Sequence, residues 1–226
     1  MSESPGFIAA FIVIAVAAAL WVGQKKRRSR SLELVARDLG FEFSKESTAV
    51  ITAQLPQLSL FRDVDILACH NSMRRRLSDG ELLVFDCTYS TGRRGDRESD
   101  TLFKQTVGAF RVHDRVLPSF ELSPKTLFHR IASLGGIATL KFENHPEFDK
   151  RFLLHSDSEA ETRHLFFPML EFFVRWENRW DQVIEGKGSW IIIYRRDHRL
   201  KPREIAAFAK TVNDIGSGFA AARQRV

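Results

Sequence analysis

Residues 64–90 read VDILACHNSMRRRLSDGELLVFDCTYS, two apolar runs on either side of an Asp79-Gly80 pair. Each run is rich in residues that favour strands, and Asp-Gly between two such runs is a typical hairpin turn. The segment therefore predicts an antiparallel hairpin of strands 64–73 and 81–90. A third strand-like run, residues 102–112, extends the hairpin into a meander.

The same turn predicts where the two cysteines lie. If Asp79 and Gly80 form a two-residue loop, Cys87 lies opposite Ser72, and Cys69 points to the other face of the sheet because it is three residues from Ser72. We therefore expect Cys69 and Cys87 not to pair. Two unpaired cysteines are typical of a protein in a reducing cytoplasm.

Helices and further strands are expected on both sides of the meander. Before it, the pattern predicts helices at 31–39 and 48–55 with a short strand at 41–43; after it, Ser123-Pro124 predicts a helix start, and strands follow at 137–142 and 148–155. A long aromatic helix at 158–179, a hairpin at 180–194 and an amphipathic helix from Pro202 to Phe219 complete the chain. We expect the aromatic helix to be buried in the core, the alternative being that it rests on a bilayer or a partner. The fold class is α+β, a body of antiparallel sheet with packed helices, in two subdomains at 31–119 and 120–226.

The N-terminal segment from Phe7 to Gly23 contains no polar side chain and would form a helix of about 25 Å, enough to cross a bilayer with some snorkelling of flanking lysines. Residues 1–6 carry no basic side chain, whereas a cleaved secretory signal begins with one. The pattern therefore favours a retained single transmembrane helix, residues 1–23 being tail and span. Positive charge follows the span, so we expect the N-terminus outside and the body in the cytoplasm.

A basic juxtamembrane segment, residues 24–30, follows the span. We call its Lys25, Lys26, Arg27, Arg28 and Arg30 the basic collar. The whole chain holds 34 basic and 28 acidic residues, of which the first thirty positions hold five and one, so 29 basic and 27 acidic residues remain in the body. A nearly neutral body argues against nucleic-acid binding. The collar is expected to contact anionic lipid, although it could serve only to set topology.

No motif predicts a catalytic residue, a bound cofactor or a metal site. The seven histidines lack metal-ligand spacing, and neither cysteine belongs to a Cys-x-x-Cys pair. Gly186-Lys187-Gly188-Ser189 is similar to part of a phosphate-binding loop, but it lacks the spacing of that loop and a strand follows it. We therefore expect no cofactor.

A loose motif, Phe148-Asp149-x-x-Phe152-x-Leu154-x-Ser156-Asp157, leads into the long aromatic helix, a hairpin and a closing helix. In this arrangement residues 120–219 resemble uncharacterised bacterial membrane-anchored families that are described only as domains of unknown function. The resemblance implies a bacterial α+β domain beside a membrane, which we expect to be the bacterial inner membrane, and transfers no catalytic residue. We expect a membrane-tethered binding or scaffolding module; an enzyme with an unrecognised site and a sensor of anionic lipid are the alternatives.

Overall fold

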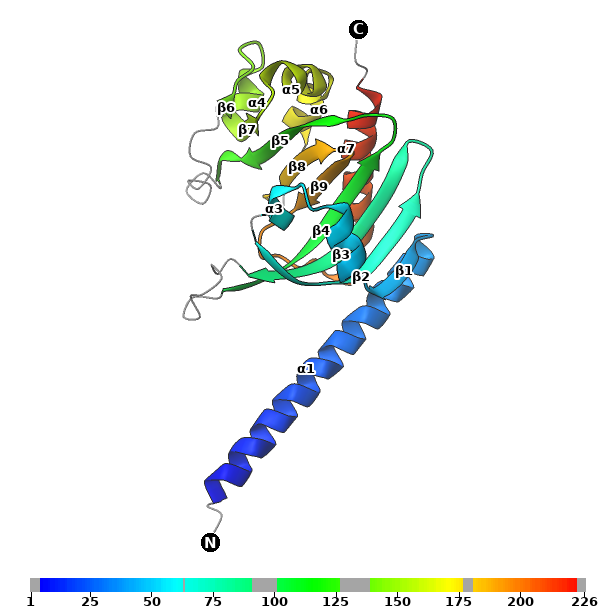
Figure 1. Cartoon of the computed structure of the whole chain (residues 1–226), viewed down its shortest axis with the longest axis vertical. Helices are drawn as coiled ribbons and strands as arrows, with labels where there is room; N and C mark the ends of the chain where they lie inside the picture. Colours follow the sequence, from blue (N-terminus) through cyan, green and yellow to red (C-terminus); the bar gives the residue numbers. More distant parts are fainter. Residues whose placement is uncertain (1–4, 63, 91–100, 127–138, 177–180, 223–226) are drawn as a thin grey trace.

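The computed structural model describes residues 5–62, 64–90, 101–126, 139–176 and 181–222, with side chains from residue 22 on, Leu67 excepted. Within these ranges the fold is α+β, as expected, and its strands form one nine-stranded antiparallel sheet in the order β1-β2-β3-β4-β9-β8-β5-β7-β6 (Figure 1). The strands are β1 (Glu42–Glu46), β2 (Asp65–Arg76), β3 (Gly80–Ser90), β4 (Leu102–Val112), β5 (Leu117–Pro124), β6 (Thr139–Leu140), β7 (Phe152–Ser156), β8 (Val183–Gly188) and β9 (Trp190–Tyr194).

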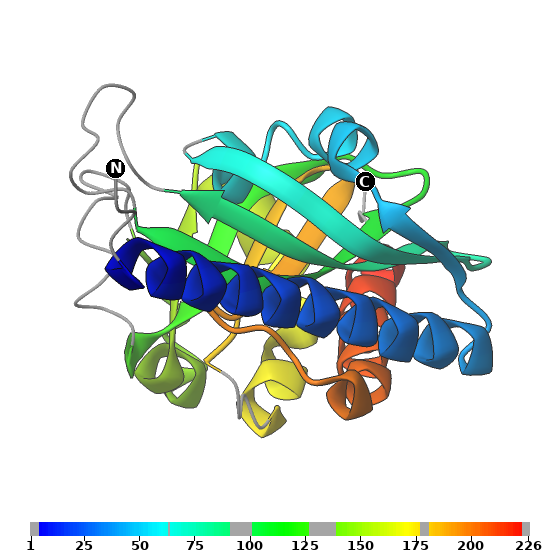
Figure 2. The same cartoon turned by 90° about the horizontal axis from the view of Figure 1, so that it is seen from below.

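Helices cover both faces of the sheet. They are α1 (Pro5–Asp38), α2 (Thr48–Gln54), α3 (Ser59–Arg62), α4 (Pro146–Arg151), α5 (Glu159–Phe166), α6 (Leu170–Arg175) and α7 (Ile205–Ala221), with 3-10 turns η2 (Phe167–Met169) and η3 (Pro202–Glu204). Seen from below, α2 and α3 lie on one side of the sheet, and α1, α7 and the α4–α6 group lie on the other (Figure 2).

The alternation of each strand divides the core between these two faces. On the α7 face, Val84, Phe110 and Ile193 belong to a large cluster with Phe120, Phe166 and Phe219. On the α2–α3 face, Phe85, Val107 and Ile192 belong to a second cluster. The inner strands β3, β4 and β9 are therefore apolar on both sides, as expected for Trp190–Tyr194.

The predicted hairpin is confirmed, but its expected register is wrong. Arg76 pairs with Glu81, so the turn is wider than two residues, and a bulge between His70 and Met73 shifts the pairing by one more position. Cys69 consequently lies opposite Cys87, with both thiols free, buried and 3.9 Å apart. The bulge contains Asn71, whose φ of 52° is a left-handed conformation that asparagine tolerates.

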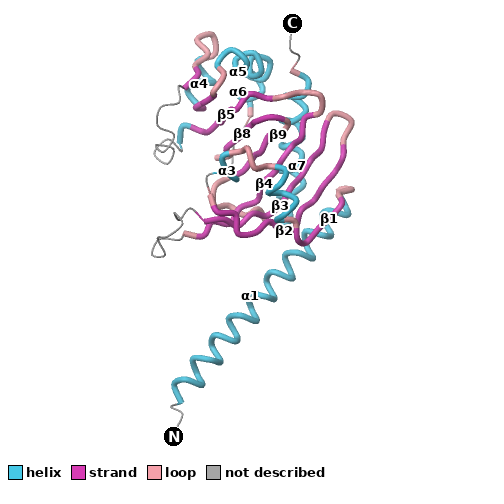
Figure 3. Tube along the Cα trace, viewed as in Figure 1, coloured by secondary structure: helices cyan, strands magenta, loops and turns pink. Residues whose placement is uncertain are grey.

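The second half differs from expectation at one helix start. Ser123-Pro124 ends strand β5 and does not open a helix; the later part of the expected helix, residues 127–133, lies outside the described residues. The aromatic helix is present but is divided into α5, η2 and α6, because Pro168 lacks the N–H that a continuous helix needs (Figure 3). The expected strand at 148–155 begins only at Phe152, after the short α4.

Helix α1 is one continuous helix of 34 residues, about 51 Å long, where the sequence suggested a span and a separate helix at 31–39. Residues 24–30 are glutamine, lysine, arginine and serine, which do not interrupt a helix. In the described part of the chain no helix meets the length and hydropathy required of a membrane span. Nearly all side chains of the expected span, Phe7 to Gly23, lie outside that part, so the span stays a prediction.

The expected boundary between residues 119 and 120 lies inside β5, and β4 of the first half pairs with β9 of the second. The sheet therefore runs through both expected subdomains. The division itself stays a prediction.

Candidate functional site

The junction between α1 and the sheet contains a buried ion pair. Arg28 donates from Nε to Asp86 Oδ2 at 2.8 Å and from Nη2 to Asp86 Oδ1 at 2.7 Å, a bidentate arrangement. Its third hydrogen bond runs from Nη1 to the carbonyl oxygen of Leu200, also at 2.8 Å. One side chain of α1 therefore contacts β3 and the segment that precedes α7.

Asp86 is an acidic residue in an otherwise apolar strand, and its side chain is only 2% exposed. Asn71 donates to Oδ2 and Thr106 donates to Oδ1, each at 3.0 Å, while Arg199 Nε lies 3.8 Å from Oδ1. Burying a carboxylate is costly unless hydrogen bonds compensate for it, and Asn71, Thr106 and Arg28 supply these bonds to Asp86.

Apolar packing secures the same junction further along α1. Leu32 and Ala36 are buried in the large core cluster, and Leu39 packs against it. The C-terminal third of α1 is thus part of the folded body, while the rest projects from it (Figure 1).

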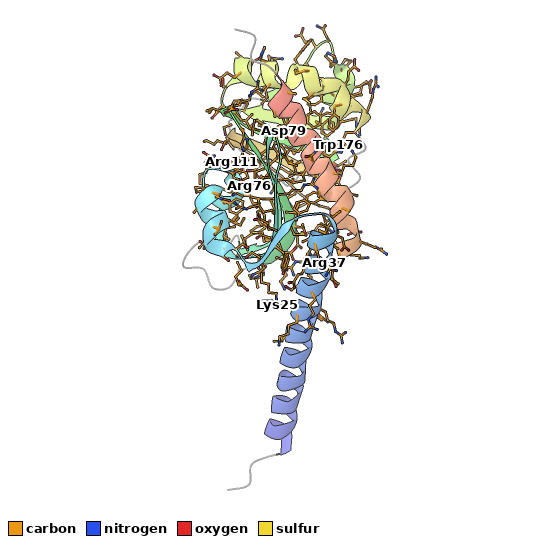
Figure 4. The ribbon with its side chains drawn as sticks, turned by 90° about the vertical axis from the view of Figure 1, so that its right-hand side faces the viewer. Lys25, Arg37, Arg76, Asp79, Arg111 and Trp176 are labelled. Carbon is orange, nitrogen blue, oxygen red and sulfur yellow. The ribbon has the colours of Figure 1, made fainter. Side chains whose placement is uncertain are left out.

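The basic collar divides between two environments. Arg28 is bound to Asp86, whereas Lys25, Lys26, Arg27 and Arg30 are exposed on α1. Lys25 lies at the lower edge of the body, and Arg76 lies well above Arg37 toward the opposite end (Figure 4). Lipid contact by the collar is untested; its exposed members are the four residues other than Arg28.

A second candidate site is a pair of buried acids on the α2–α3 side of the sheet. Glu121 of β5 and Glu185 of β8 are register partners, so their side chains lie on one face at neighbouring positions. Glu185 Oε2 accepts hydrogen bonds from the Ser59 N–H at 2.9 Å and the Ser59 hydroxyl at 2.5 Å, and its Oε1 accepts one from the Tyr194 hydroxyl at 2.6 Å. Glu185 therefore has partners on both carboxylate oxygens.

Glu121 is in a different electrostatic situation. Burial first, and then the negative charge of Glu185, raise the pKa of Glu121 to about 7, while Arg196 acts in the opposite direction. Its Oε1 is buried with no hydrogen-bond partner among the described residues. Two adjacent carboxyl groups of which one holds a proton near neutral pH form an arrangement that can accept or donate a proton.

Neither site has the composition of a metal centre. Within the described ranges, no group of three or more histidine, cysteine, aspartate or glutamate side chains is placed to hold a metal ion. The thiols are no better suited to chemistry, because the hydrogen bond to Cys69 and burial raise the pKa of Cys87 far above its usual range.

Sequence reasoning missed both sites. A signal was present, since Asp86, Glu121 and Glu185 each interrupt an apolar strand at a position whose neighbours are core residues. An acid at such a position requires donors. Those donors come from residues far away in the sequence, such as Arg28 and Ser59, which local patterns do not reveal.

Three shallow hollows lie elsewhere. One, of about 240 Å³, is lined by residues of the β4–β5 turn and α5, including Arg115, Val116 and His164. Two others, of about 290 and 380 Å³, are both lined in part by His145 beside α4, and the larger one is also lined by Phe167. They lie apart from both charged sites.

Comparisons with known proteins bear on the fold. No protein-family model matches the sequence, and no curated protein matches it. The structure resembles the crystal structure of the mycobacterial trehalose monomycolate transport factor A, TtfA, with a TM-score of 0.58 and 13% sequence identity, over 88% of this chain and 97% of that chain. The chain therefore shares its fold, over nearly its whole length, with a bacterial transport factor.

Proposed function

We propose that this chain is a membrane-tethered binding module of the bacterial inner membrane, which holds its body in the cytoplasm and serves the transport of a lipid-like amphiphile. The observation that carries the proposal is the continuity of α1, whose helical backbone runs from Pro5 to Asp38 and whose Arg28 is bound to Asp86 in the sheet. A helix that is both anchor and core element fixes the orientation of the body relative to its own membrane span, which suits recognition of a membrane-embedded partner.

Two further observations support this role. The apolar stretch from Phe7 to Gly23 with a basic collar after it fits a single span with the N-terminus outside. The fold is similar to that of TtfA, a mycobacterial trehalose monomycolate transport factor. The transported amphiphile of this chain need not be the same molecule.

The topology is tested by cysteine labelling in intact cells. Cys69 and Cys87 are fully buried, so an introduced cysteine is the accessible thiol. We expect Ser2→Cys to react with a membrane-impermeant maleimide in intact cells, and Ala221→Cys to react only after permeabilisation. The opposite pattern, or release of the chain from membranes by alkaline carbonate, would contradict the proposal.

The binding role is tested by crosslinking in native membranes. We expect lysine-reactive crosslinks between the body and an integral protein of a lipid-transport system, at the same positions in every preparation. Arg28→Ala should redistribute these crosslinks because it removes the charged contact between anchor and sheet, whereas Arg175→Ala, at an exposed pair with Glu171, should not. Crosslinks that merely follow the abundance of neighbouring proteins would count against a specific partner.

The transport part has its own readout. Depletion of the chain should cause an amphiphile that normally reaches the outer face of the membrane to accumulate on the cytoplasmic side. An unchanged distribution of lipids would leave a binding module without a transport role.

The acid pair favours a second candidate function, an enzyme that uses Glu121 as a general acid or base. A carboxyl group with a pKa of about 7 is suited to proton transfer at neutral pH. The test is turnover of a membrane lipid extract by the purified full chain, which Glu121→Gln should abolish and Glu159→Gln, on the exposed surface of α5, should not. If the unsubstituted chain consumes no lipid, this candidate fails.

A further inference from the structure

The segment between β9 and α7, residues 195–204, is a basic stretch that lies against α1. It holds five basic residues against Asp197 and Glu204. Two of the five are directed inward, since Arg199 Nε lies 3.8 Å from buried Asp86, and Arg196 interacts with Glu121 and Glu185. The other three, Arg195, Lys201 and Arg203, are half-buried or exposed.

Arg28 fixes this segment against α1. Its Nη1 donates to the carbonyl oxygen of Leu200, and Leu200 N–H donates to Thr106 Oγ1 at 3.0 Å, so the segment is bound between α1 and β4. Seen from below, it runs alongside α1 before it enters α7 (Figure 2). The basic side chains of the segment and of the collar therefore share one end of the body.

The distance to the bilayer follows from helix geometry, and it rests on the span of the proposed function. Arg28 is five residues beyond Gly23, about 7.5 Å along the helix axis. The headgroup layer on each side of a bilayer is roughly 5–7 Å thick, and the Debye length is about 8 Å at physiological salt. The segment thus lies within reach of headgroup charge.

The two acids of the segment are already engaged with backbone. Asp197 Oδ1 accepts the N–H of Lys104 at 3.1 Å, and Glu204 Oε2 accepts the N–H of Lys201 at 2.6 Å. They stabilise the conformation of the segment, and the lysine and arginine side chains remain in excess over them. The surface is consequently cationic and preformed.

We propose that Arg195, Lys201 and Arg203, together with the exposed collar residues, form a binding surface for the headgroups of anionic phospholipids. Because α1 and the body are one unit, attraction at this surface tilts the whole unit and brings the start of α7 toward the bilayer. The collar alone would attract headgroups only to α1. The added segment makes one side of the body, that of residues 195–204, turn toward the bilayer.

A nitroxide label on α7 measures this tilt in the full chain, reconstituted in vesicles that carry a nickel-chelating lipid. Ala206→Cys places the label in the first turn of α7, near Arg203, and Ala221→Cys places it at the last residue of the helix, about 22 Å away. Both alanines are exposed, and the native thiols are buried. The two labels report on opposite ends of one rigid helix.

We expect nickel to relax the Ala206 label severalfold more strongly in vesicles of phosphatidylcholine with phosphatidylglycerol than in phosphatidylcholine alone, because anionic headgroups attract the basic side chains near the start of α7. High salt should remove the increase, and so should the double variant Lys201→Glu with Arg203→Glu. Arg76→Glu with Lys150→Glu, the same charge change at exposed positions outside the segment and α7, should preserve it, and the Ala221 label should stay insensitive to phosphatidylglycerol.

Equal relaxation of the Ala206 label in both kinds of vesicle would overturn the headgroup surface while leaving the anchor intact. An increase that persists in the Lys201→Glu and Arg203→Glu variant would also overturn it, because the collar would then be sufficient. Failure of the proposed function looks different, since the chain would be washed from the vesicles by alkaline carbonate.

Discussion

Arg28 and Asp86 are 58 residues apart in the sequence and are joined by two hydrogen bonds of 2.8 and 2.7 Å. The pair links the only part of α1 that enters the described core to the middle of β3. Its two members come from a segment expected to be juxtamembrane and from a strand expected to be core.

Removing one member of this pair should destabilise the body. Arg28→Ala leaves the Asp86 carboxylate buried with Asn71 and Thr106 as its nearest donors, and we expect a loss of about 3 kcal/mol in the free energy of unfolding. The measurement is denaturant unfolding of the detergent-solubilised full chain. Lys150→Ala, which breaks an exposed pair, should cost less than about 1 kcal/mol. Equal effects of the two variants would mean that the buried pair contributes no more than a surface pair.

The stability of the chain should depend on pH through Glu121. Its pKa is raised from 4.5 to about 7 on folding, so between these values the folded state keeps a proton that the unfolded state has lost. The free energy of unfolding therefore falls as pH rises from about 4.5 to 7, by roughly 3 kcal/mol at most. Glu121→Gln should remove this slope, and Glu159→Gln should retain it. A slope unchanged in Glu121→Gln would assign the effect to another group.

Close packing of α7 on β4 makes Gly108 sensitive to substitution. A Cβ at this position would lie 2.3 Å from Val212 Cγ2 and 3.0 Å from Phe208 Cε1. We expect Gly108→Ala to destabilise the chain by about 1–3 kcal/mol in thermal or denaturant unfolding. Gly23→Ala, in α1 with nothing within 4 Å of the new methyl group, should be neutral or slightly stabilising. If Gly108→Ala is tolerated, α7 must be able to move away from the sheet.

The thiols should be inert in the folded protein. Cys69 and Cys87 are both 0% exposed and adjacent, so a maleimide should label neither one until the chain is unfolded, and both afterwards. Mass spectrometry of the labelled chain with and without denaturant measures this. Rapid labelling of the native chain would contradict the packing of β2 on β3 that brings the thiols together.

Local patterns predicted much of the architecture. The Asp79-Gly80 hairpin, the strand at 102–112 and the amphipathic helix after Pro202 are all present, because each depends on periodicity or on turn chemistry within a few residues. The helix start predicted at Ser123-Pro124 is wrong because a Ser-Pro pair can end a strand as well as begin a helix. The register of the cysteines could not be predicted because the turn is wider than two residues and the bulge at Asn71 adds a further shift, and no short motif reveals either feature.

The charged sites could not be predicted in the same way, because each depends on pairs that only the complete sheet brings together. Glu121 meets Glu185 through the pairing of β5 with β8, and Arg28 meets Asp86 because α1 passes beside the middle of β3. The sequence contained the acids in apolar strands but not the identity of their partners. The basic collar was visible, whereas the different use of Arg28 within it was not.

The unbroken helical path through residues 24–28 has a consequence for how the body faces its surroundings. Each residue of an α-helix adds a rotation of about 100° and a rise of about 1.5 Å. The number of residues between Gly23 and Arg28 therefore determines both the rotation of the sheet about the helix axis and its distance from Gly23 along that axis. One inserted alanine would turn every surface of the body through more than a quarter circle while changing no contact within it. If α1 spans a membrane as proposed, the helical phase of this one segment determines the direction in which the body faces along that membrane.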